Sequence, residues 1–306
     1  MKFTRNFQSS AASDRVKIHQ MDSIRRRNQE QLFYHQNNFT LNQFQLFPFH
    51  LVSQSPWPLF VSFSLFNLVI SFVMYMQGIS YGGGLSLLNL TVLVSFMSLW
   101  FRDVANEGAL LGDHTRQVMR GISIGFLLFI ISEVFAFISV FWAFFHSSLS
   151  PAIELGGSFP PLGVEGLNAY AIPLLNTILL LSSGAYITFG HHALVTGLRK
   201  YTIDGIIVTI ILAIVFTAMQ GFEYYQTTFT IADSVFGSSF FAATGLHGFH
   251  VIIGTIFITV GFFRVCSYRL TKSHHQGLES SIVYWHFVDV VWLFLFIVVY
   301  CWACNV

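Results

Sequence analysis

An acidic side chain, Glu133, lies within a long apolar segment, between Phe129 and Phe137. If the segment is helical, the residues three and four positions away are Phe, Ile and Ala, and none of these can pair with a carboxylate. Because a charge is costly in such surroundings, we expect the neutral acid. An acid of this kind could handle protons, or it could make a hydrogen bond that fixes helix packing.

Four more ionisable side chains fall in two apolar segments nearer the C-terminus. In the first segment, His247 and His250 lie on one face of a helix. In the second, His286 and Asp289 do the same. Two imidazoles and a carboxylate could bind a metal ion. Such groups more often hydrogen-bond to one another across a helix bundle, and we favour that interpretation.

Patterns that support catalysis or bind a cofactor are otherwise missing from the sequence. His191 and His192 are adjacent, so they point to different faces of a helix and suit one ion poorly. No apolar segment has two His at the spacing that seats two stacked haems, and Cys301 and Cys304 have no two further ligands nearby. A phosphate-binding loop, a nucleophile elbow and a metalloprotease helix are absent too. We therefore expect no catalytic residue, haem or metal in this chain.

The composition is that of a protein that spans a membrane. Of the 306 residues 54% are hydrophobic and 9% are charged, whereas a soluble domain has about 25% charged residues. So few charges cannot cover a surface that faces water. The net charge of +1 gives no electrostatic basis for binding nucleic acid, and three cysteines in apolar surroundings are too few for a disulfide scaffold.

Seven apolar segments are long enough to cross a bilayer as helices, since a span needs about 20 mainly apolar residues. They are Pro58–Met76, Leu85–Phe101, Met119–Phe145, Ile172–Leu194, Ile203–Tyr225, Val235–Phe263 and Ser281–Trp302. The triplet Gly82-Gly83-Gly84 is interpreted as the joint between the first two. The predicted fold is an all-α polytopic membrane protein with seven transmembrane helices.

The basic residues define an orientation, because connectors on the inner side of a membrane carry the excess of Lys and Arg. With the N-terminus inside, the inner segments 1–57, 102–118, 195–202 and 264–280, together with Arg120, hold all 15 basic residues. The outer segments 77–84, 146–171, 226–234 and 303–306 hold none. This excludes G-protein-coupled receptors and retinal proteins, which place the N-terminus outside.

Residues 1–49 form a polar, basic arm separate from the predicted membrane region, residues 50–306. The first 27 residues carry seven of the 15 Lys and Arg together with several Ser and few acids, which is typical of a transit peptide. A retained arm that lies on the membrane or on a partner is the alternative, and we favour it.

Long strings of residues from about Phe49 to the C-terminus carry a resemblance to a known family. They are HLVS at 50–53, SPWP at 55–58, WFRDV at 100–104, ISEV at 131–134, FWAFFHSSL at 141–149, PLLNT at 173–177, FEYY at 222–225, ATGLHGFHVIIG at 243–254 and YWHFVDVVW at 284–292. In this order they resemble the subunit III family of haem–copper cytochrome c oxidases, in its mitochondrial and related bacterial form.

The resemblance implies a fold, partners and a function. The seven helices would divide into a pair and a group of five, with structural phospholipids in the cleft between them. Haem a, haem a3 and copper would belong to sister subunits, among them the catalytic subunit I. The complex would pass electrons from cytochrome c to dioxygen and pump protons, and this subunit would support proton uptake and offer oxygen an apolar route. The location would be the mitochondrial inner membrane, with the N-terminus in the matrix and the C-terminus in the intermembrane space.

The resemblance also assigns residues. Glu133 matches the carboxyl group that reacts with carbodiimides in this family, and Trp100, Arg102 and Arg264 match positions at the lipid headgroups. Glu223, in the FEYY string, joins the polar contacts expected within the bundle.

The sequence departs from the family pattern in three places. A second Trp is usual where Phe101 stands, an acid where Leu198 stands, and a run of Ala where residues 280–283 read SSIV. Because the acid at 198 is missing, the family pattern does not predict the polar contacts of that inner connector.

Two alternatives remain at this point. A bacterial plasma membrane is the other possible location. A transporter that uses Glu133 and the histidines as a proton relay is the other possible function. An inverted repeat, or helices broken by Pro and Gly in matching halves, would favour the transporter, and the sequence contains neither.

Overall fold

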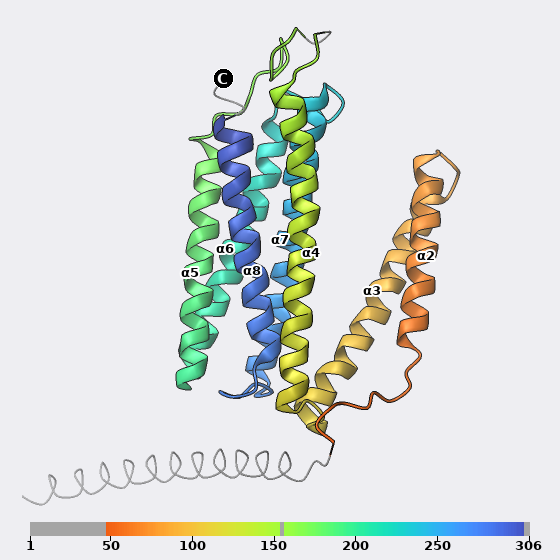
Figure 1. Cartoon of the computed structure of the whole chain (residues 1–306), viewed down its shortest axis with the longest axis vertical. Coiled ribbons are helices and arrows are strands. Elements are labelled where there is room, and N and C mark those ends of the chain that lie inside the picture. The colour runs from red at the N-terminus through yellow and green to blue at the C-terminus, as the bar shows by residue number, and fades with distance from the viewer. Residues whose placement is uncertain (1–46, 154–155, 303–306) are drawn as a thin grey trace, which may run out of the picture. The chain divides into compact units, whose positions relative to one another are not determined.

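The computed structural model describes residues 47–153 and 156–302 (Figure 1). Over these residues the regular secondary structure is helical, without strands. Seven of the helices are long and apolar enough to cross a membrane. The prediction of an all-α, multi-pass membrane protein is therefore confirmed. The predicted arm of residues 1–49 lies almost entirely outside the described residues.

The helices agree with the predicted segments in number and order. They are α2 (Trp57–Met76), α3 (Gly82–Asn106), the π-helical η1 (Glu107–Leu111), α4 (Arg116–Leu149), α5 (Ile172–Thr196), α6 (Arg199–Gln226), α7 (Val235–Cys266), α8 (Gln276–Leu295) and the π-helical η3 (Phe296–Trp302). Most of them extend a few residues beyond the apolar segment that predicts them. Hydropathy locates the part of a helix that lies in lipid, and backbone hydrogen bonding continues past it.

The prediction for the second helix was wrong at both ends. The Gly82-Gly83-Gly84 triplet is the first turn of α3, and the joint lies before it, where Gly78 has φ +69°. Gly82 allows close packing on α2, because a Cβ there would lie 2.6 Å from the backbone nitrogen of Tyr75. At the other end, α3 continues through Arg102 and Asp103, which form an ion pair of 2.9 Å.

The chain divides into two compact units, Met1–Met119 and Arg120–Val306. The first contains α2, α3 and η1, which form an antiparallel pair of spans. Two serines of α2 are buried here, and each bonds a carbonyl of its own helix: Ser64 that of Val61 and Ser71 that of Leu68. Small side chains that satisfy their own polar groups let two helices approach closely in a membrane.

The second unit contains α5 to α8 and all but the first turn of α4. Helices α5 and α6 cross at two glycines, since a Cβ on Gly205 would lie 2.9 Å from the Cα of Gly190. Helices α7 and α8 meet where a Cβ on Gly254 would lie 2.9 Å from the ring of Trp285. Helix α4 contacts the others through aromatic side chains, as in the ring pair of Phe126 and Phe257. The core of this unit is a column of aromatic and aliphatic side chains between the helices.

Candidate functional site

Glu133, the acid singled out in the sequence, faces another helix of its unit. It lies on α4, and its Oε2 is 2.9 Å from Nε2 of His250 on α7. The side chain of His250 is 7% exposed and that of Glu133 is 23% exposed, so the contact is largely removed from the surface. The sequence predicts His250 as a bundle contact and leaves Glu133 open between proton handling and a packing hydrogen bond. The structure shows that the two residues contact each other.

The second ring nitrogen of His250 determines where protons can lie in this pair. Nδ1 of His250 is 2.8 Å from the backbone carbonyl of Leu246. A carbonyl only accepts hydrogen bonds, so Nδ1 carries a proton. Nε2 then accepts a hydrogen bond from a neutral Glu133, or it carries a second proton and donates a hydrogen bond to a carboxylate. Either way the contact holds one proton that can lie on either side chain.

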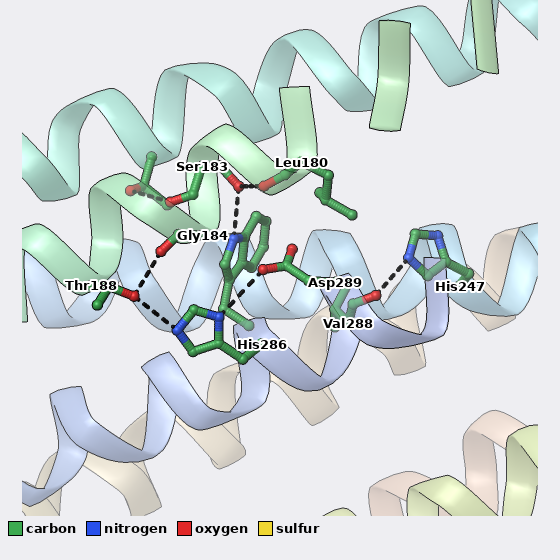
Figure 2. Close-up of polar contacts among 10 residues, drawn as sticks. Leu180, Ser183, Gly184, Thr188, His247, His286, Val288 and Asp289 are labelled. Carbon is green, nitrogen blue, oxygen red and sulfur yellow. Dashed lines mark hydrogen bonds and ion pairs between the residues drawn. The ribbon is translucent and has the colours of Figure 1, made fainter. Parts of the chain in front are cut away.

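His247, one turn before His250 on α7, has a different partner. Its Nε2 is 3.3 Å from the carbonyl of Val288 on α8, and the side chain is buried (Figure 2). Its ring also packs against Phe216 and Trp292, at centroid distances of 5.9 and 5.2 Å. This histidine therefore joins α7 to α8 and to the aromatic core.

His286 bridges α8 to α5. Its Nε2 is 3.1 Å from the hydroxyl of Thr188, and its Nδ1 is 3.4 Å from Oδ2 of Asp289 (Figure 2). Asp289 is buried against α5 at Gly184, where a Cβ would lie 2.5 Å from Oδ2. Gly184 therefore makes room for the carboxyl group. Nearby, the indole of Trp285 donates to Ser183 of α5 at 2.9 Å.

Glu223, predicted as a polar contact within the bundle, belongs to a buried network whose other members were not predicted. The hydroxyl of Tyr300 donates to Oε1 of Glu223 at 2.6 Å, and Nε2 of Gln220 approaches the same oxygen at 3.4 Å. Asn176 of α5 extends the network by donating to Gln220 at 3.3 Å. All four side chains are buried. The network joins α5, α6 and η3, and it leaves Oε2 of Glu223 without a hydrogen-bond partner among the described residues.

The contacts of His247, of His250, and of His286 with Asp289 are thus separate and do not form one centre. His250 pairs with α4, while His247 bonds the backbone of α8. His286 and Asp289 lie against α5. Among the described residues, the two His and the carboxylate considered from the sequence do not come together as metal ligands. A different group of three possible ligands does lie close together. Cys301 is a free, partly buried thiol in η3, and Cys304 lies outside the described residues.

The residues expected at lipid headgroups lie at helix ends. Arg102 is exposed near the end of α3, and two of its nitrogens donate to Oδ1 of Asp103, at 3.1 and 2.9 Å. The other oxygen of Asp103 accepts from the indole of Trp57 at 2.6 Å. Trp100 is partly buried two residues before Arg102. Arg102 therefore keeps one terminal nitrogen free of Asp103 for a phosphate, so this position fits a lipid headgroup only in part.

Arg264 lies in the last turn of α7, in the second unit, and is partly buried. Its guanidinium lies over Gly277, where a Cβ would come within 2.6 Å of a terminal nitrogen. In the connector that follows, burial lowers the pKa of His274, and the charge of Arg264 lowers it further. A neutral imidazole beside a guanidinium leaves the positive charge available to an anion, which fits a headgroup phosphate.

The connector between α5 and α6 has Leu198 where the family usually has an acid, and Arg199 holds this connector to α7. The guanidinium of Arg199 donates to the carbonyls of Val265, at 3.2 and 3.3 Å, and of Cys266, at 2.8 Å, at the end of α7. It also lies 3.8 Å from the ring centre of Tyr268. The carbonyls at a helix C-terminus favour a cation, so these contacts fasten α6 to α7 without a carboxylate.

Comparisons with known proteins agree with this architecture. The family model described as cytochrome c oxidase subunit III matches residues 47–304. Three fungal proteins, each named cytochrome c oxidase subunit 3, are similar over most of the chain. That of Mycosarcoma maydis is 60% identical over 266 residues, covering 85% of this chain and 97% of the relative. That of Schizophyllum commune is 57% identical with the same coverage, and that of Yarrowia lipolytica is 51% identical over 87% of this chain and 99% of the relative.

Proposed function

The chain belongs to the cytochrome c oxidase subunit III family, and from this premise we propose that it is the subunit of a respiratory terminal oxidase that supports the catalytic subunit without carrying a redox centre. The oxidase would transfer electrons from cytochrome c to dioxygen and pump protons. The match of the family model over residues 47–304 is the observation that carries this proposal.

Haem a, haem a3 and copper belong, in this proposal, to sister subunits. A supporting observation is that three of the histidines inside the spans are already engaged. His247 bonds a backbone carbonyl, His250 bonds Glu133, and His286 bonds Thr188. To serve as axial ligands of a haem, these histidines would have to give up such contacts. The polar groups of the spans are therefore assigned to helix packing and to proton balance.

We assign the Glu133–His250 pair a part in supporting proton uptake. A proton held between an acid and an imidazole can move from one side chain to the other without breaking the contact, because both arrangements of charge keep the hydrogen bond. Between Arg120 and His146, Glu133 is the one ionisable residue of α4, so the pair would be the ionisable point of this helix within the membrane. Its role is to support the sister subunits, which hold the redox chemistry.

Phospholipids and the catalytic subunit are the proposed neighbours of the apolar outer faces. In the apolar stretch of the span that contains α3, 6% of the residues are buried within the chain, and in those of α2 and α4 11% are buried. In the stretch that covers α8 and η3 the buried share is 50%. Exposed apolar faces of this extent need lipid or protein to cover them. Arg102 in the first unit and Arg264 in the second would each hold an anionic headgroup.

We place the chain in the mitochondrial inner membrane, with its N-terminus in the matrix and its C-terminus in the intermembrane space. The distribution of basic residues supports this orientation, since segments of one side hold all 15 Lys and Arg. The fungal origin of close relatives supports the mitochondrial location over a bacterial one.

A transporter with a proton relay is less well supported. A relay requires ionisable groups within hydrogen-bonding reach of one another along a path. Here Glu133 with His250, His247 with Val288, and His286 with Thr188 are separate contacts, each between two different helices. Each contact is suited to joining two helices.

Co-purification tests the proposed function directly. An affinity tag on the C-terminus of the full chain should retain, from mild detergent, a complex with the absorbance of haem a and with cytochrome c oxidase activity. A tagged membrane protein of the same compartment serves as the control. Recovery of the folded chain without haem a, from membranes that contain active oxidase, would refute the assignment.

A further inference from the structure

Three side chains of the first unit come together although they are far apart in the sequence. His50, Glu107 and His114 each offer one ligand atom, and these atoms all lie within 4.8 Å of one another. Each of the three residues is partly buried. None of them belongs to the contacts described above.

The local fold explains how the three meet. His50 lies in the segment before α2, Glu107 begins η1, and His114 follows η1 in the turn that leads to α4. The buried hydroxyl of Thr115 donates to the carbonyl of Pro48, which fastens the segment before α2 to this turn. The rings of His50 and His114 then meet edge to face, with centroids 5.7 Å apart.

The turn itself is shaped to hold His114. Gly112, with φ +76°, reverses the chain after η1, and the amide of Asp113 donates to the carbonyl of Glu107 at 3.2 Å. Gly108 provides space for the imidazole, because a Cβ there would lie 2.6 Å from Nδ1 of His114. The π-helical segment thus brings Glu107 and His114 to the same place, and π-helical turns are common at functional sites.

The donor set is that of a divalent transition metal. Imidazole nitrogen and carboxylate oxygen bind zinc at about 2.0–2.2 Å, which places neighbouring ligand atoms about 3.3 Å apart in a tetrahedral site. The ligand atoms lie within 4.8 Å of one another. Rotation of the side chains can bring them to the shorter spacing that a bound ion requires. A second carboxylate stands beside the set, with Oδ2 of Asp113 at 3.8 Å from Nε2 of His50. Two carboxylates balance the charge of a divalent cation.

We propose that His50, Glu107 and His114 form a binding site for one divalent transition-metal ion, with zinc as the best match, which fastens the segment before α2 to the turn after α3. Zinc suits the set because it accepts both nitrogen and oxygen ligands and four-coordinate geometry. Asp113 lies close enough to serve as the fourth ligand or to orient His50. No short sequence pattern indicates this site, because the nearest of these ligands to His50 is 57 residues away along the chain.

Zinc binding by the full-length chain tests the proposal. The chain is purified in mild detergent, treated with a chelator and titrated with Zn²⁺ at pH about 7.5, where histidine is mostly neutral. Metal retained after gel filtration is measured by mass spectrometry. We expect one equivalent of tightly held zinc, and each of His50→Gln, Glu107→Gln and His114→Gln should weaken binding by at least about tenfold. The controls His192→Gln and Glu165→Gln change exposed residues elsewhere and should bind as the wild type does.

X-ray absorption at the zinc edge of the wild-type chain gives a reading that does not depend on the variants folding. We expect the spectrum to show two imidazole ligands on the zinc ion, with oxygen atoms as its remaining ligands. A chain that retains less than one equivalent, a wild-type spectrum with fewer than two imidazoles, or unchanged affinity in the three folded variants would each refute the site. None of these results depends on oxidase activity, so they leave the proposed function untouched.

Discussion

Glu133 and His250 are separated by 117 residues in the sequence and by 2.9 Å between their polar atoms. The contact joins α4 to α7. Helix α4 also reaches its neighbours through ring contacts such as that of Phe137 with Phe287. Because Nδ1 of His250 is committed to the carbonyl of Leu246, the pair holds one proton between its two members. The pair therefore links helix packing and protonation in one hydrogen bond.

Substitutions of Glu133 should separate these two properties. Glu133→Gln keeps a donor for Nε2 of His250 but cannot exchange a proton, so we expect normal assembly and most of the electron-transfer activity. Glu133→Ala leaves the imidazole without its partner, and unfolding should become easier by about 1–3 kcal/mol. The recovery of haem a with the tagged chain, the thermal unfolding midpoint and the oxidase turnover are the measurements.

Two outcomes would contradict this account of the pair. Glu133→Ala with the stability of the wild type would show that the hydrogen bond does not hold α4. Loss of oxidase turnover in a fully assembled Glu133→Gln complex would make Glu133 a proton carrier in the reaction itself.

The hydroxyl of Tyr300 should be important for stability, because it is a buried donor to Glu223. Tyr300→Phe removes the donor and leaves the carboxyl group with only the weaker contact from Gln220. We expect a loss of about 1–3 kcal/mol in stability, measured as a lower thermal midpoint of the purified complex. The matched control is Tyr225→Phe, since Tyr225 is 88% exposed. Equal midpoints for the two variants would argue against the network.

Part of this architecture could be predicted from the sequence, because bilayer spans are determined by local composition. Seven apolar segments gave seven helices, and Glu133 stood out because an acid is rare at that depth. The ends of α3 could not be predicted from hydropathy. The charges of Arg102 and Asp103 neutralise each other, and the helix continues through them.

The partners of the predicted residues required the fold. The partner of Glu133 is on a helix that arrives more than a hundred residues later, so helical spacing could not identify it. Tyr300 and Asn176 lie in ordinary apolar runs, although Gln220, three residues before Glu223 in an apolar helix, was a signal that a second polar group faced the same way. His50, Glu107 and His114 come together only through a π-helical turn, which has no reliable sequence pattern.

Gly184 should be intolerant of a side chain. A Cβ there would lie 2.5 Å from Oδ2 of Asp289, which is buried and held next to His286. Gly184→Ala should therefore displace the carboxyl group and cost about 1–3 kcal/mol of stability. Gly221→Ala is the control, since nothing lies within 4 Å of its Cβ position in α6 and alanine favours a helix. A Gly184→Ala complex as stable as the control would contradict the close approach of α5 and α8.

Arg264 should hold an anionic phospholipid more strongly than Arg102 does, because two nitrogens of Arg102 already donate to Asp103. We expect Arg264→Ala to lower the anionic lipid retained by the purified complex, and Arg264→Lys to restore part of it, since ammonium lacks the planar fork of guanidinium. Native mass spectrometry measures the retained lipid. Lys200→Ala, which changes an exposed cation, is the control. Equal lipid retention in Arg264→Ala and Lys200→Ala would refute the assignment.

The orientation can be tested with two proteases, because the outer segments contain no Lys or Arg. Trypsin cleaves after these residues, so trypsin added to the outer side of intact inner membranes should leave the chain whole. Chymotrypsin cleaves after aromatic residues, and Tyr81 and Tyr170 in the outer connectors are 86% and 69% exposed. Chymotrypsin from the same side should therefore cut, which shows that the outer connectors are accessible. After permeabilisation, trypsin should cut the connector between α7 and α8, where Lys272 is exposed. Tryptic fragments from intact membranes would reverse the orientation, since they could arise only from segments that the distribution of charge places inside.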